Sequence, residues 1–418
     1  MKLAIIGGGI SGLYAAWRLA PSHQVSVFEA NNYVGGHTHT VDVTVASGRY
    51  AVDTGFIVCN DRTYPLFLQF LEELQVGRKA TDMSFSVSCA RSGLEYNGHN
   101  LNTLFAQRRN LLSPRFWKLL RDILRFNALA KAVLRDQAIN NEQTLAGFLQ
   151  QHGFAGDVVS HYLAPMTAAI WSTPLREVSQ FPLGFFLQFC DNHGLLNVSD
   201  RPQWYVIEGG SRRYVEALLQ RLPATVQSGT PVRWVRRHSD SVELTFADDR
   251  REHFDQVIFA CHSDEALQLL TDPSPEESQV LAAIPYQESE VVLHTDQRLL
   301  PKTPRAWAAW NYLLGDEPTG SALPTLTYNM NMLQGIQAPE TFCVTLNRSG
   351  AIAPEQVLGR YRYAHPQFSK AAVAAQLRHG EISGVRRSHY CGAYWGFGFH
   401  EDGVRSAARV VNQLQESR

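Results

Sequence analysis

Three glycines and one glutamate near the start of the chain form a pattern that binds dinucleotides. Gly7, Gly9 and Gly12 follow the G-x-G-x-x-G spacing, and Glu29 comes 17 residues after Gly12. The first glycine makes a tight turn, the second lets a pyrophosphate approach the backbone, and the third lets a helix pack on a strand. A carboxylate at Glu29 can accept hydrogen bonds from both ribose hydroxyls and disfavours a 2′-phosphate by charge repulsion.

A second group of residues that could do chemistry lies near the C-terminus. Glu401 and Asp402 fall in the first turn of a helix predicted to begin at "FHEDGVRSAARVV", directly after Gly396 and Gly398. Acids in a first turn complement the helix dipole. The amides at such a helix N-terminus can face an electron-rich carbonyl of a ligand.

Aromatic and amide side chains gather in "WAAWNYLLG" and "TLTYNMNMLQG", between residues 306 and 335. Large apolar faces with a few hydrogen-bonding tips are typical of ligand pockets. Ordinary packing in a β-sheet explains each residue equally well, so both interpretations stay open. We predict that the substrate-facing residues are Trp310, Tyr312, Asn329, Asn331, Trp395 and Phe399.

Apolar runs and turn residues predict the elements that position these groups. Leu3–Ile6 and Val25–Phe28 read as buried parallel strands, and Leu13–Leu19 as the helix between them. A hairpin is expected over Thr40–Val45 and Tyr50–Val52. Later helices are predicted at 63–78, 113–135 and 144–195, after Gly209, and near 355 and 370, with strands at Val232–Val235, Val242–Phe246, Val257–Ala260, Val291–His294, Thr325–Tyr328, Phe342–Leu346 and Tyr390–Gly392.

This alternation predicts an α/β fold with a Rossmann-like nucleotide-binding domain and an interleaved α+β substrate-binding domain. The chain has 418 residues, which suggests two domains. The nucleotide-binding domain is expected to comprise 1–60, 200–265 and 385–418, and the substrate-binding domain 61–199 and 266–384, with a helical insert.

The stretch 113–135 is predicted to be one amphipathic helix. Ser113 can cap it, and Pro114 suits its first turn. The apolar face is expected to contain Phe116, Leu119, Leu120, Ile123, Leu124, Ala130, Val133 and Leu134, with Lys and Arg elsewhere on the helix. One interpretation is a core-facing helix with a solvated basic face. The other is contact with anionic lipid or an acidic partner.

Composition excludes several classes of protein. The net charge is −1, so a nucleic-acid partner is not indicated. No apolar run reaches the ~20 residues of a membrane span. A secretory signal peptide is not expected, because Arg18 and the glycines interrupt the apolar core that such a peptide needs. The six cysteines are dispersed, so no metal site is expected, and reduced thiols in a cytoplasmic, at most membrane-peripheral, protein are favoured.

Six motifs together resemble the flavin-containing amine oxidase superfamily, which also includes protoporphyrinogen oxidases and phytoene desaturases. They are "IIGGGISGLYAAWRLA…VSVFEA", "VGGHTHT", "VDTGFIV", "EGGSRRYVEAL", "VIFACHSDEAL" and "CGAYWGFGFHEDGVRSA". "YNMNMLQG" and "GFHEDG" are similar to a bacterial branch known as predicted NAD/FAD-binding proteins, some associated with fatty-acid modification. The resemblance implies an amine-oxidase-like fold and FAD as the cofactor.

The resemblance also implies which residues hold FAD. Pyrophosphate would lie at the first glycine motif, adenosine at Glu29 and Val232, and the flavin ring near Gly55. The amides of Gly403 and Val404 would face the flavin N1–O2 edge. The full set is Gly7, Gly9, Ile10, Ser11, Gly12, Glu29, Ala30, Gly35, Gly36, His37, Thr38, Gly55, Phe56, Ile57, Val232, Gly392, Glu401, Asp402, Gly403 and Val404.

Two positions depart from the family pattern. His37 stands where the family usually has Arg after the glycine pair, and a neutral imidazole donates more weakly to phosphate than a guanidinium. Ala393 stands where an acid usually binds the ribityl chain, so Glu401 or Asp402 is expected to substitute for it.

The flavin itself is the reactive group, so few catalytic side chains are expected. Tyr328 and His400 are predicted as polar groups near flavin N5, and Lys302 is not expected to supply the lysine of many amine oxidases. FAD is expected to be non-covalent. The first functional hypothesis is hydride removal from an apolar substrate such as an unsaturated acyl chain, giving desaturation or double-bond isomerisation. The alternatives are a peroxide-producing amine oxidase and a non-catalytic, flavin-stabilised binding protein.

Overall fold

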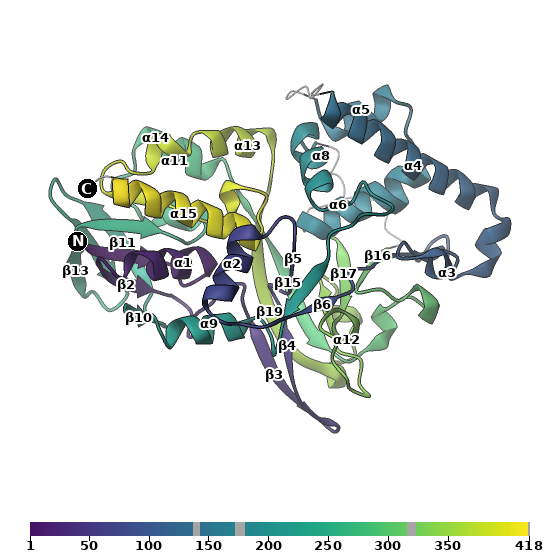
Figure 1. The fold of residues 1–418 in the computed structure, drawn as a ribbon, viewed down its shortest axis with the longest axis horizontal. Coiled ribbons are helices and arrows are strands. Elements are labelled where there is room, and N and C mark those ends of the chain that lie inside the picture. Colours follow the sequence, from purple (N-terminus) through teal and green to yellow (C-terminus); the bar gives the residue numbers. More distant parts are fainter. Residues whose placement is uncertain (137–142, 172–179, 316–322, 417–418) are drawn as a thin grey trace.

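The computed structural model describes residues 1–136, 143–171, 180–315 and 323–416. The fold has two halves side by side, and both chain ends lie in the same half (Figure 1). That half is built around a five-stranded sheet, and the other around a seven-stranded sheet covered by a group of helices. This is the predicted α/β class of fold.

The five-stranded sheet is parallel and carries the first glycine motif. Its order is β10(Thr225–Gln227), β2(Gln24–Phe28), β1(Lys2–Ile6), β14(Gln256–Phe259) and β20(Ser388–Tyr390). Helices on its faces bury the apolar runs, which is typical of parallel sheets. Helix α1(Ile10–Leu19) follows β1 directly, so the chain turns sharply at Gly7 to Gly9.

The last helix closes the same half. α15(His400–Glu416) packs on α1, and its buried face includes Val404, Ala407 and Val411. A Cβ atom on Gly403 would lie 2.9 Å from both Ile10 Cγ2 and Ser11 Oγ. The two ends of the chain therefore meet at the N-termini of their helices, and only glycine allows this approach.

The seven-stranded sheet is mixed and forms the floor of the other half. Its order is β19(Val357–Pro366), β15(Tyr286–His294), β18(Cys343–Leu346), β17(Thr325–Asn329), β16(Trp310–Leu314), β7(Phe85–Cys89) and β8(Glu95–Asn97). All pairs are antiparallel except β16 with β7. Trp310 pairs with Tyr328 in register, which brings the two aromatic segments of the sequence together.

Helices of the insert pack over one end of this sheet. They are α4(Pro114–Arg135), α5(Leu145–Gln151), the π-helix Val159–Leu163, α6(Ala164–Trp171) and α8(Leu183–Asn192). Their phenylalanines form one core with Tyr312 and Leu326 of the sheet. Residues 172–179 of the predicted helical stretch lie outside the described residues.

Smaller sheets and helices complete the fold. The sheets are the hairpin β3(Thr40–Val45)–β4(Gly48–Asp53), the sheet β5(Val58–Asn60)–β9(Trp204–Ile207)–β6(Arg78–Thr81), and the sheet β11(Val232–Arg237)–β12(Val242–Phe246)–β13(Arg251–Phe254). The other α-helices in the described part of the chain are α2(Pro65–Glu73), α3(Leu101–Leu104), α9(Arg212–Leu219), α10(Ser263–Leu269), α11(Pro275–Ala282), α12(Met330–Leu333), α13(Lys370–Leu377) and α14(His379–Ile382). Short 3-10 helices occur at Arg108–Leu112, Gln297–Leu299, Pro304–Ala306, Ser349–Ala351, Pro354–Gln356 and Ala393–Trp395.

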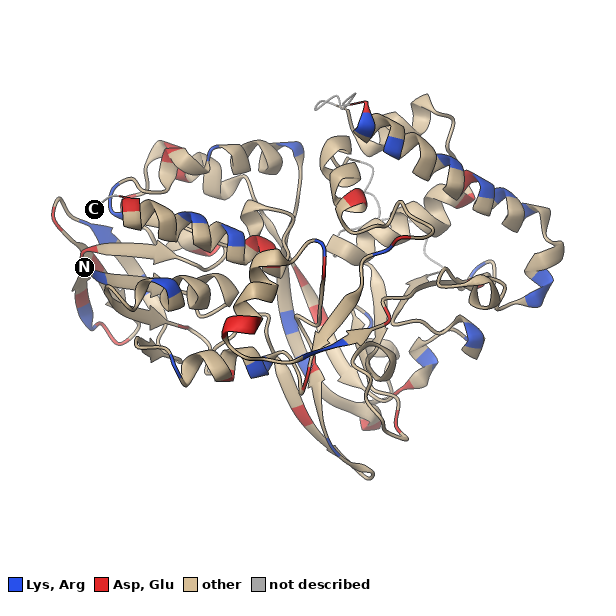
Figure 2. Cartoon of the chain, viewed as in Figure 1, with Lys and Arg blue, Asp and Glu red and all other residues tan. Residues whose placement is uncertain are grey.

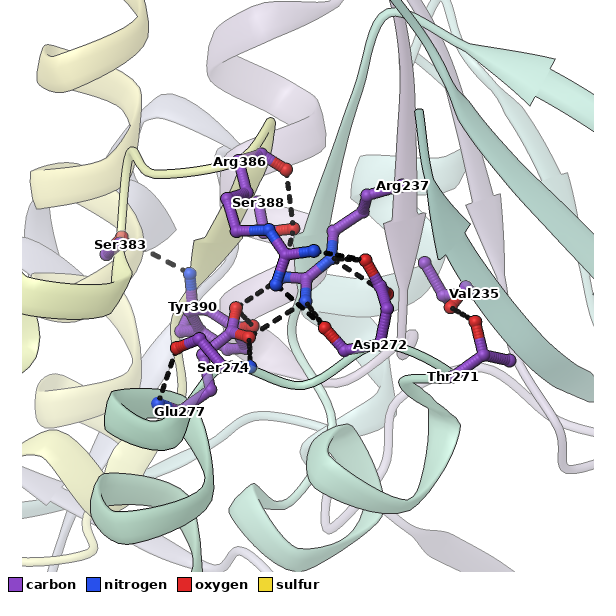
Figure 3. Close-up of polar contacts among 10 residues, drawn as sticks. All are labelled: Val235, Arg237, Thr271, Asp272, Ser274, Glu277, Ser383, Arg386, Ser388 and Tyr390. Carbon is purple, nitrogen blue, oxygen red and sulfur yellow. Dashed lines mark hydrogen bonds and ion pairs between the residues drawn. The ribbon is translucent and has the colours of Figure 1, made fainter. Parts of the chain in front are cut away.

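A buried ion pair joins β11 to helix α11 and the sheet strand β20. Arg237 and Glu277 are almost fully buried, and the Nη2 of Arg237 donates to Glu277 at 2.8 Å. Asp272 accepts from Arg237 Nε at 3.2 Å, and the Tyr390 hydroxyl donates to Glu277 at 2.7 Å (Figure 3). Each buried charge has several hydrogen-bonding partners, so no charge is left unpaired. The cluster therefore links these three elements to one another.

Three sequence predictions about elements were wrong or incomplete. The helix predicted near 355 is a 3-10 turn followed by the ten-residue strand β19, because Tyr361 and Tyr363 alternate with polar residues and pair with β15. The helix predicted at 63–78 ends at Glu73, and β6 begins at Arg78. Leu124, expected in the core, is 55% exposed, while Asp122 is buried in its place.

Most predicted strands of the nucleotide-binding domain lie in the five-stranded sheet or share its cores, but the hairpin β3–β4 packs through Val43 and Val52 on the seven-stranded sheet. Conversely, α11, α13 and α14 from the predicted substrate-binding ranges share a core with the five-stranded sheet. The division of the chain into domains stays a prediction. No described helix has the combination of length and hydropathy needed to cross a bilayer. All six cysteines are described and are free thiols.

Candidate functional site

A cavity of about 1660 Å³ is lined by both halves of the molecule. One end meets the glycine turn after β1, and the other meets aromatic residues of the seven-stranded sheet and the helical insert. Single-ligand pockets commonly measure ~300–1,000 Å³. The cavity therefore has room for a dinucleotide and a second ligand together.

The glycine turn is shaped as a phosphate cradle. Gly7 has a φ of +109°, and a Cβ on it would lie 2.7 Å from the Ala260 carbonyl oxygen. A Cβ on Gly12 would lie 2.0 Å from the Gly7 carbonyl oxygen, so this position holds the helix against the turn. Gly9 has no heavy atom within 4 Å of such a Cβ, because it faces open space in the cavity. This space at the N-terminus of α1 fits a pyrophosphate.

Glu29 lies at the end of β2 and lines the cavity. Its Oε2 accepts from the Gly8 N–H at 2.7 Å, and its Oε1 accepts from the Asn31 N–H at 2.8 Å. Each carboxylate oxygen can accept more than one hydrogen bond. These contacts hold the carboxylate in place and leave acceptor capacity for ribose hydroxyls.

His37 is buried beside two further histidines at the cofactor end. Its ring lies 5.4 Å from His365 and 6.1 Å from His262. Burial, and then the neighbouring imidazoles, lower the pKa of His37 well below its usual value, although the Ala364 backbone acts in the opposite direction. The Nε2 of His37 and the Nδ1 of His365 have no hydrogen-bond partner among the described residues. Unpaired buried nitrogens at a cavity wall fit polar contact with a ligand.

Most of the predicted cofactor residues line this cavity. They are Gly7, Gly9, Ile10, Ser11, Glu29, Ala30, Gly35, Gly36, His37, Gly55, Phe56, Ile57, Val232 and Gly392. Gly12, Thr38, Glu401, Asp402, Gly403 and Val404 are not among the lining residues. Ala393 lines the cavity and offers no polar side-chain atom there.

The two acids of the last helix bind backbone instead of facing the cavity. Glu401 accepts from the N–H groups of Leu66 and Phe67 at 3.1 and 2.9 Å, which caps helix α2. Asp402 accepts from the N–H groups of Phe397 and Phe399, each at 3.0 Å. Neither carboxylate is placed to substitute for the acid that Ala393 replaces. This differs from the sequence prediction, because both carboxylates already accept hydrogen bonds from backbone N–H groups.

The amide of Gly403 also differs from its predicted role. Its N–H donates to the Phe399 carbonyl at 3.1 Å, so it is already paired inside α15. The helix begins at His400, and the first-turn amides that precede this bond belong to His400, Glu401 and Asp402. Any amide contact to a ligand at this end must therefore come from earlier in the helix than predicted.

His400 lines the cavity at the junction of the two chain ends. Its Nε2 lies 3.1 Å from the Thr38 hydroxyl and 3.0 Å from the Tyr214 hydroxyl. The imidazole stacks on Phe56 with ring centroids 3.5 Å apart. Burial lowers the pKa of His400 to about 3, so the ring is neutral near pH 7. The neutral ring is held in one orientation by two hydroxyls and one aromatic face.

The substrate end of the cavity is aromatic. Trp310 and Tyr328 form its floor, with ring centroids 5.0 Å apart and nearly perpendicular planes. Phe399 also lines the cavity and stacks on Phe189 with ring centroids 5.2 Å apart. Burial raises the pKa of Tyr328 above its usual value, so its hydroxyl keeps its proton near pH 7. Trp310 Nε1 has no partner among the described residues.

Four residues predicted to face substrate do not line the cavity. Tyr312 is buried in the core shared with the helical insert. Asn329 caps α12 by accepting from the Met332 N–H, and Asn331 accepts from Phe342 and donates to Glu340. Trp395 packs edge-on against His379. The amide groups satisfy local backbone, a use that residue type alone does not exclude.

Several lining residues were not predicted from the sequence. Tyr363 and His365 come from β19, which was not predicted as a strand, and His262 precedes α10. The alternation in "YRYAHP" is the signal that could have placed Tyr361, Tyr363 and His365 on one face. Missed residues of the substrate end include Met166, Ile170, Trp171, Phe189, His193 and Phe368. Among the described residues, no group of His, Cys, Asp or Glu is arranged to hold a metal ion.

The sequence matches the family described as flavin containing amine oxidoreductase over residues 10–415. A 1-hydroxycarotenoid 3,4-desaturase from Flavobacterium sp. (strain P99-3) is 49% identical over 55 residues, which is 13% of this chain and 10% of that protein. The matched segment thus spans a small part of the curated relative's length.

Solved structures share the whole fold at low identity. The chain is similar to a CLA-producing fatty acid isomerase from P. acnes, with a TM-score of 0.72, 13% identity, and coverage of 99% of this chain and 98% of that chain. It is also similar to cyclohexylamine oxidase from Brevibacterium oxydans IH-35A, with a TM-score of 0.67, 17% identity, and 99% coverage of both chains. At these identities the likeness establishes the fold alone.

Proposed function

Because the chain belongs to the flavin containing amine oxidoreductase family, we propose that it is an FAD-dependent enzyme acting on an apolar substrate such as an unsaturated acyl chain. The family makes it a flavin-dependent oxidoreductase; FAD and the substrate class are our proposals. The reaction would be desaturation or double-bond isomerisation. A bound flavin supplies a hydride acceptor for such chemistry.

The cofactor end supports FAD as the flavin. Gly7 and Gly9 leave room for a pyrophosphate at the N-terminus of α1, and Glu29 is held where it can accept from a ribose. A flavin mononucleotide lacks the adenosine whose ribose hydroxyls would donate to Glu29. The unpaired Nε2 of His37 would contact a phosphate oxygen.

The apolar lining of the substrate end carries the proposal of an acyl substrate. It includes Met166, Ile170, Trp171, Phe189, Trp310, Tyr328, Phe368, Phe397 and Phe399. Among the described residues, the carboxylates on the cavity wall are Glu29, Asp82, Glu265 and Glu288. Asp82 lies 3.4 Å from His99, and Glu288 lies 3.4 Å from Arg362, so both already have a basic neighbour. An amine substrate would bring an ammonium group that needs a carboxylate or other acceptors. An acyl chain needs only apolar contact and exclusion of water.

His400 and Tyr328 would orient the substrate rather than carry a charge. His400 is neutral and anchored by the hydroxyls of Thr38 and Tyr214, and Tyr328 stays protonated. Both are therefore hydrogen-bonding groups of fixed protonation at the cavity wall. Lys302 is not among the lining residues, and within the described part of the chain Lys79 is the only lysine that is.

The test is anaerobic mixing of the purified yellow protein with oleic acid, with phosphatidylglycerol vesicles bearing oleoyl chains, and with cyclohexylamine or putrescine. We expect the acyl compounds to bleach the flavin absorbance or to yield a shifted double bond, detected by mass spectrometry. Peroxide formed from the amines without any lipid product would contradict the acyl proposal. Failure of every compound to bleach the flavin or to give a product would favour a non-catalytic flavoprotein.

Non-covalent attachment of FAD is proposed as well. Cys391 follows β20 and is fully buried, burial raises the pKa of its thiol to about 12, and it does not line the cavity. Cys261 does line the cavity, beside the glycine turn rather than the aromatic end. Acid precipitation is expected to leave the yellow colour in the supernatant, and a yellow pellet would contradict the proposal.

A further inference from the structure

We propose that one surface of the helical half docks on an anionic lipid bilayer. This docking surface comprises α3, the 3-10 helix Arg108–Leu112 and the outer face of α4. Its apolar members are Leu101, Leu111, Leu112, Trp117 and Leu124, and its basic members are Arg108, Arg109, Lys118 and Arg121.

Large apolar side chains are concentrated on the docking surface. Leu112 is 89% exposed and Leu101 is 75% exposed. Among the described residues, eleven large apolar side chains are exposed, and five of them fall between 101 and 124. Scattered single exposures are normal on protein surfaces, but such a cluster marks an interaction site.

The three segments form one continuous surface. The Trp117 indole N–H donates to the Leu111 carbonyl at 2.9 Å, which ties α4 to the 3-10 helix. The Trp117 ring lies 5.4 Å from the Phe105 ring. Arg108 donates to the carbonyls of Asn102 and Phe105, so α3 is joined to the same surface.

Positive charge surrounds these apolar side chains. Residues 101–135 contain eight Lys or Arg and one acid, although the whole chain carries a net charge of −1. Blue positions follow α4 and its preceding turns in Figure 2. Asp122 pairs with Lys118 at 2.7 Å and lies 3.7 Å from Arg121, so one acid faces two bases, while Arg108 and Arg109 donate to neutral carbonyls and an amide. Their charge is therefore available to an anionic partner.

The combination favours a bilayer over an acidic protein. An interfacial helix buries Trp and Leu at the headgroup level while Lys and Arg contact anionic lipid. Trp117 and Leu124 are seven residues apart, so they share the outer face of α4, with Arg121 between them. Each Lys or Arg near an anionic surface adds to the attraction.

The docking surface adjoins the substrate end of the cavity. Gly98 and His99 line the cavity, and the next residues, Asn100 and Leu101, cap and begin α3. A docked protein would thus present this end of the cavity near the lipid. Docking itself is independent of the acyl substrate proposed above, because vesicle binding is measured without turnover.

The test is flotation of the flavin-loaded protein with vesicles of phosphatidylglycerol and phosphatidylcholine, and with phosphatidylcholine alone. We expect binding only to the anionic vesicles, with loss at high salt. Leu101→Ser/Leu112→Ser and Arg109→Gln/Arg121→Gln should each weaken binding about tenfold or more, equivalent to ~1.4 kcal/mol or more. The first pair removes apolar contact with the bilayer, and the second removes attraction to anionic headgroups. All four side chains are on exposed positions.

Matched controls carry the same changes elsewhere. Arg213→Gln/Arg360→Gln removes two exposed charges, and Leu377→Ser removes an 87% exposed leucine; both should bind vesicles like the wild type. Flavin absorbance and thermal midpoint report that each variant is folded. The proposal is overturned if the wild type binds no vesicles, which would leave an acidic protein as partner, or if both double substitutions retain full binding.

Discussion

The Nε2 atom of His400 lies 3.1 Å from the hydroxyl of Thr38. His400 begins the last helix, and Thr38 follows the glycine pair after the second strand, so this contact joins the two ends of the chain at the cavity wall. Tyr214 completes the group with hydroxyl contacts of 2.5 Å to Thr38 and 3.0 Å to His400. Three distant segments must therefore fold correctly before this imidazole can face a ligand.

His400→Phe should keep the stack on Phe56 and lose the hydrogen bonds of the imidazole. We expect a stability loss of about 1 kcal/mol, since Thr38 and Tyr214 still bond to each other. Anaerobic bleaching by an acyl substrate should slow about tenfold or more, by analogy with loss of a positioned polar group, while FAD affinity is retained. Stopped-flow absorbance and thermal melts measure these effects.

Tyr214→Phe is the matched control for His400→Phe. It removes a hydroxyl from the same group, but Tyr214 does not line the cavity. We expect a similar loss of stability and a bleaching rate near that of the wild type. Equal slowing in both variants would show that His400 acts only through the fold.

Gly9→Val should fill the phosphate cradle without disturbing the protein around it. Gly9 has an ordinary φ of −76°, and a Cβ atom added to it would have no heavy atom within 4 Å. The apo protein should lose only about 1 kcal/mol, as for a poorer N-cap, while FAD affinity falls at least about tenfold by calorimetric titration. Gly350→Val, at another open and exposed glycine, should leave FAD affinity unchanged. If Gly9→Val retained its affinity for FAD, the phosphates would have to bind at a different place.

His37→Leu tests whether the unpaired imidazole contacts a phosphate. The Nε2 of His37 is buried without a partner among the described residues, but the ring also has a hydrogen bond with the Ala364 backbone, so leucine should lower apo stability by about 1 kcal/mol. FAD affinity should fall about tenfold, equivalent to ~1.4 kcal/mol. His389→Leu is the control outside this cavity; it loses the contact of His389 with Gln256 and should lower stability but not FAD affinity. An unchanged affinity in His37→Leu would contradict the contact.

Acidification from pH 7 towards pH 4.5 should lower the thermal midpoint steeply. Burial lowers the folded-state pKa of nine histidines, to about 4 for His193 and His365 and about 3 for His400. The nine are His37, His39, His161, His193, His294, His365, His379, His389 and His400. Below the unfolded pKa of about 6.5, the unfolded chain binds protons that the folded chain does not, so stability falls as pH falls.

Three buried acids act in the opposite direction. Burial raises the folded-state pKa of Asp53 and Asp402 to about 6 and raises that of Glu401. These groups bind protons first in the folded state, so acidification stabilises it through them. Because each group contributes up to about 1.4 kcal/mol per pH unit, the nine histidines outweigh the three acids. A thermal midpoint that is constant or rises between pH 7 and 4.5 would show that the histidines are not buried as described.

Local sequence determined the first glycine turn and its flanking elements. The spacing of Gly7, Gly9 and Gly12, an apolar run before them and an acid at Glu29 are constraints within thirty residues. Backbone sterics and strand–helix packing act over that distance, so the turn and the cavity-facing glycines could be predicted. Ser113 likewise caps α4 as predicted, because a cap is a contact between near neighbours.

Tertiary structure alone decided which polar side chains face the cavity. Glu401 and Asp402 have the right type and place in the sequence, yet backbone N–H groups of Leu66, Phe67, Phe397 and Phe399 claim them. His365 was not predicted as a site residue, yet strand pairing sets it beside His37. A buried polar group forms a hydrogen bond with a partner that the fold places beside it. That partner comes from distant segments, so residue type could name the candidates but could not choose among them.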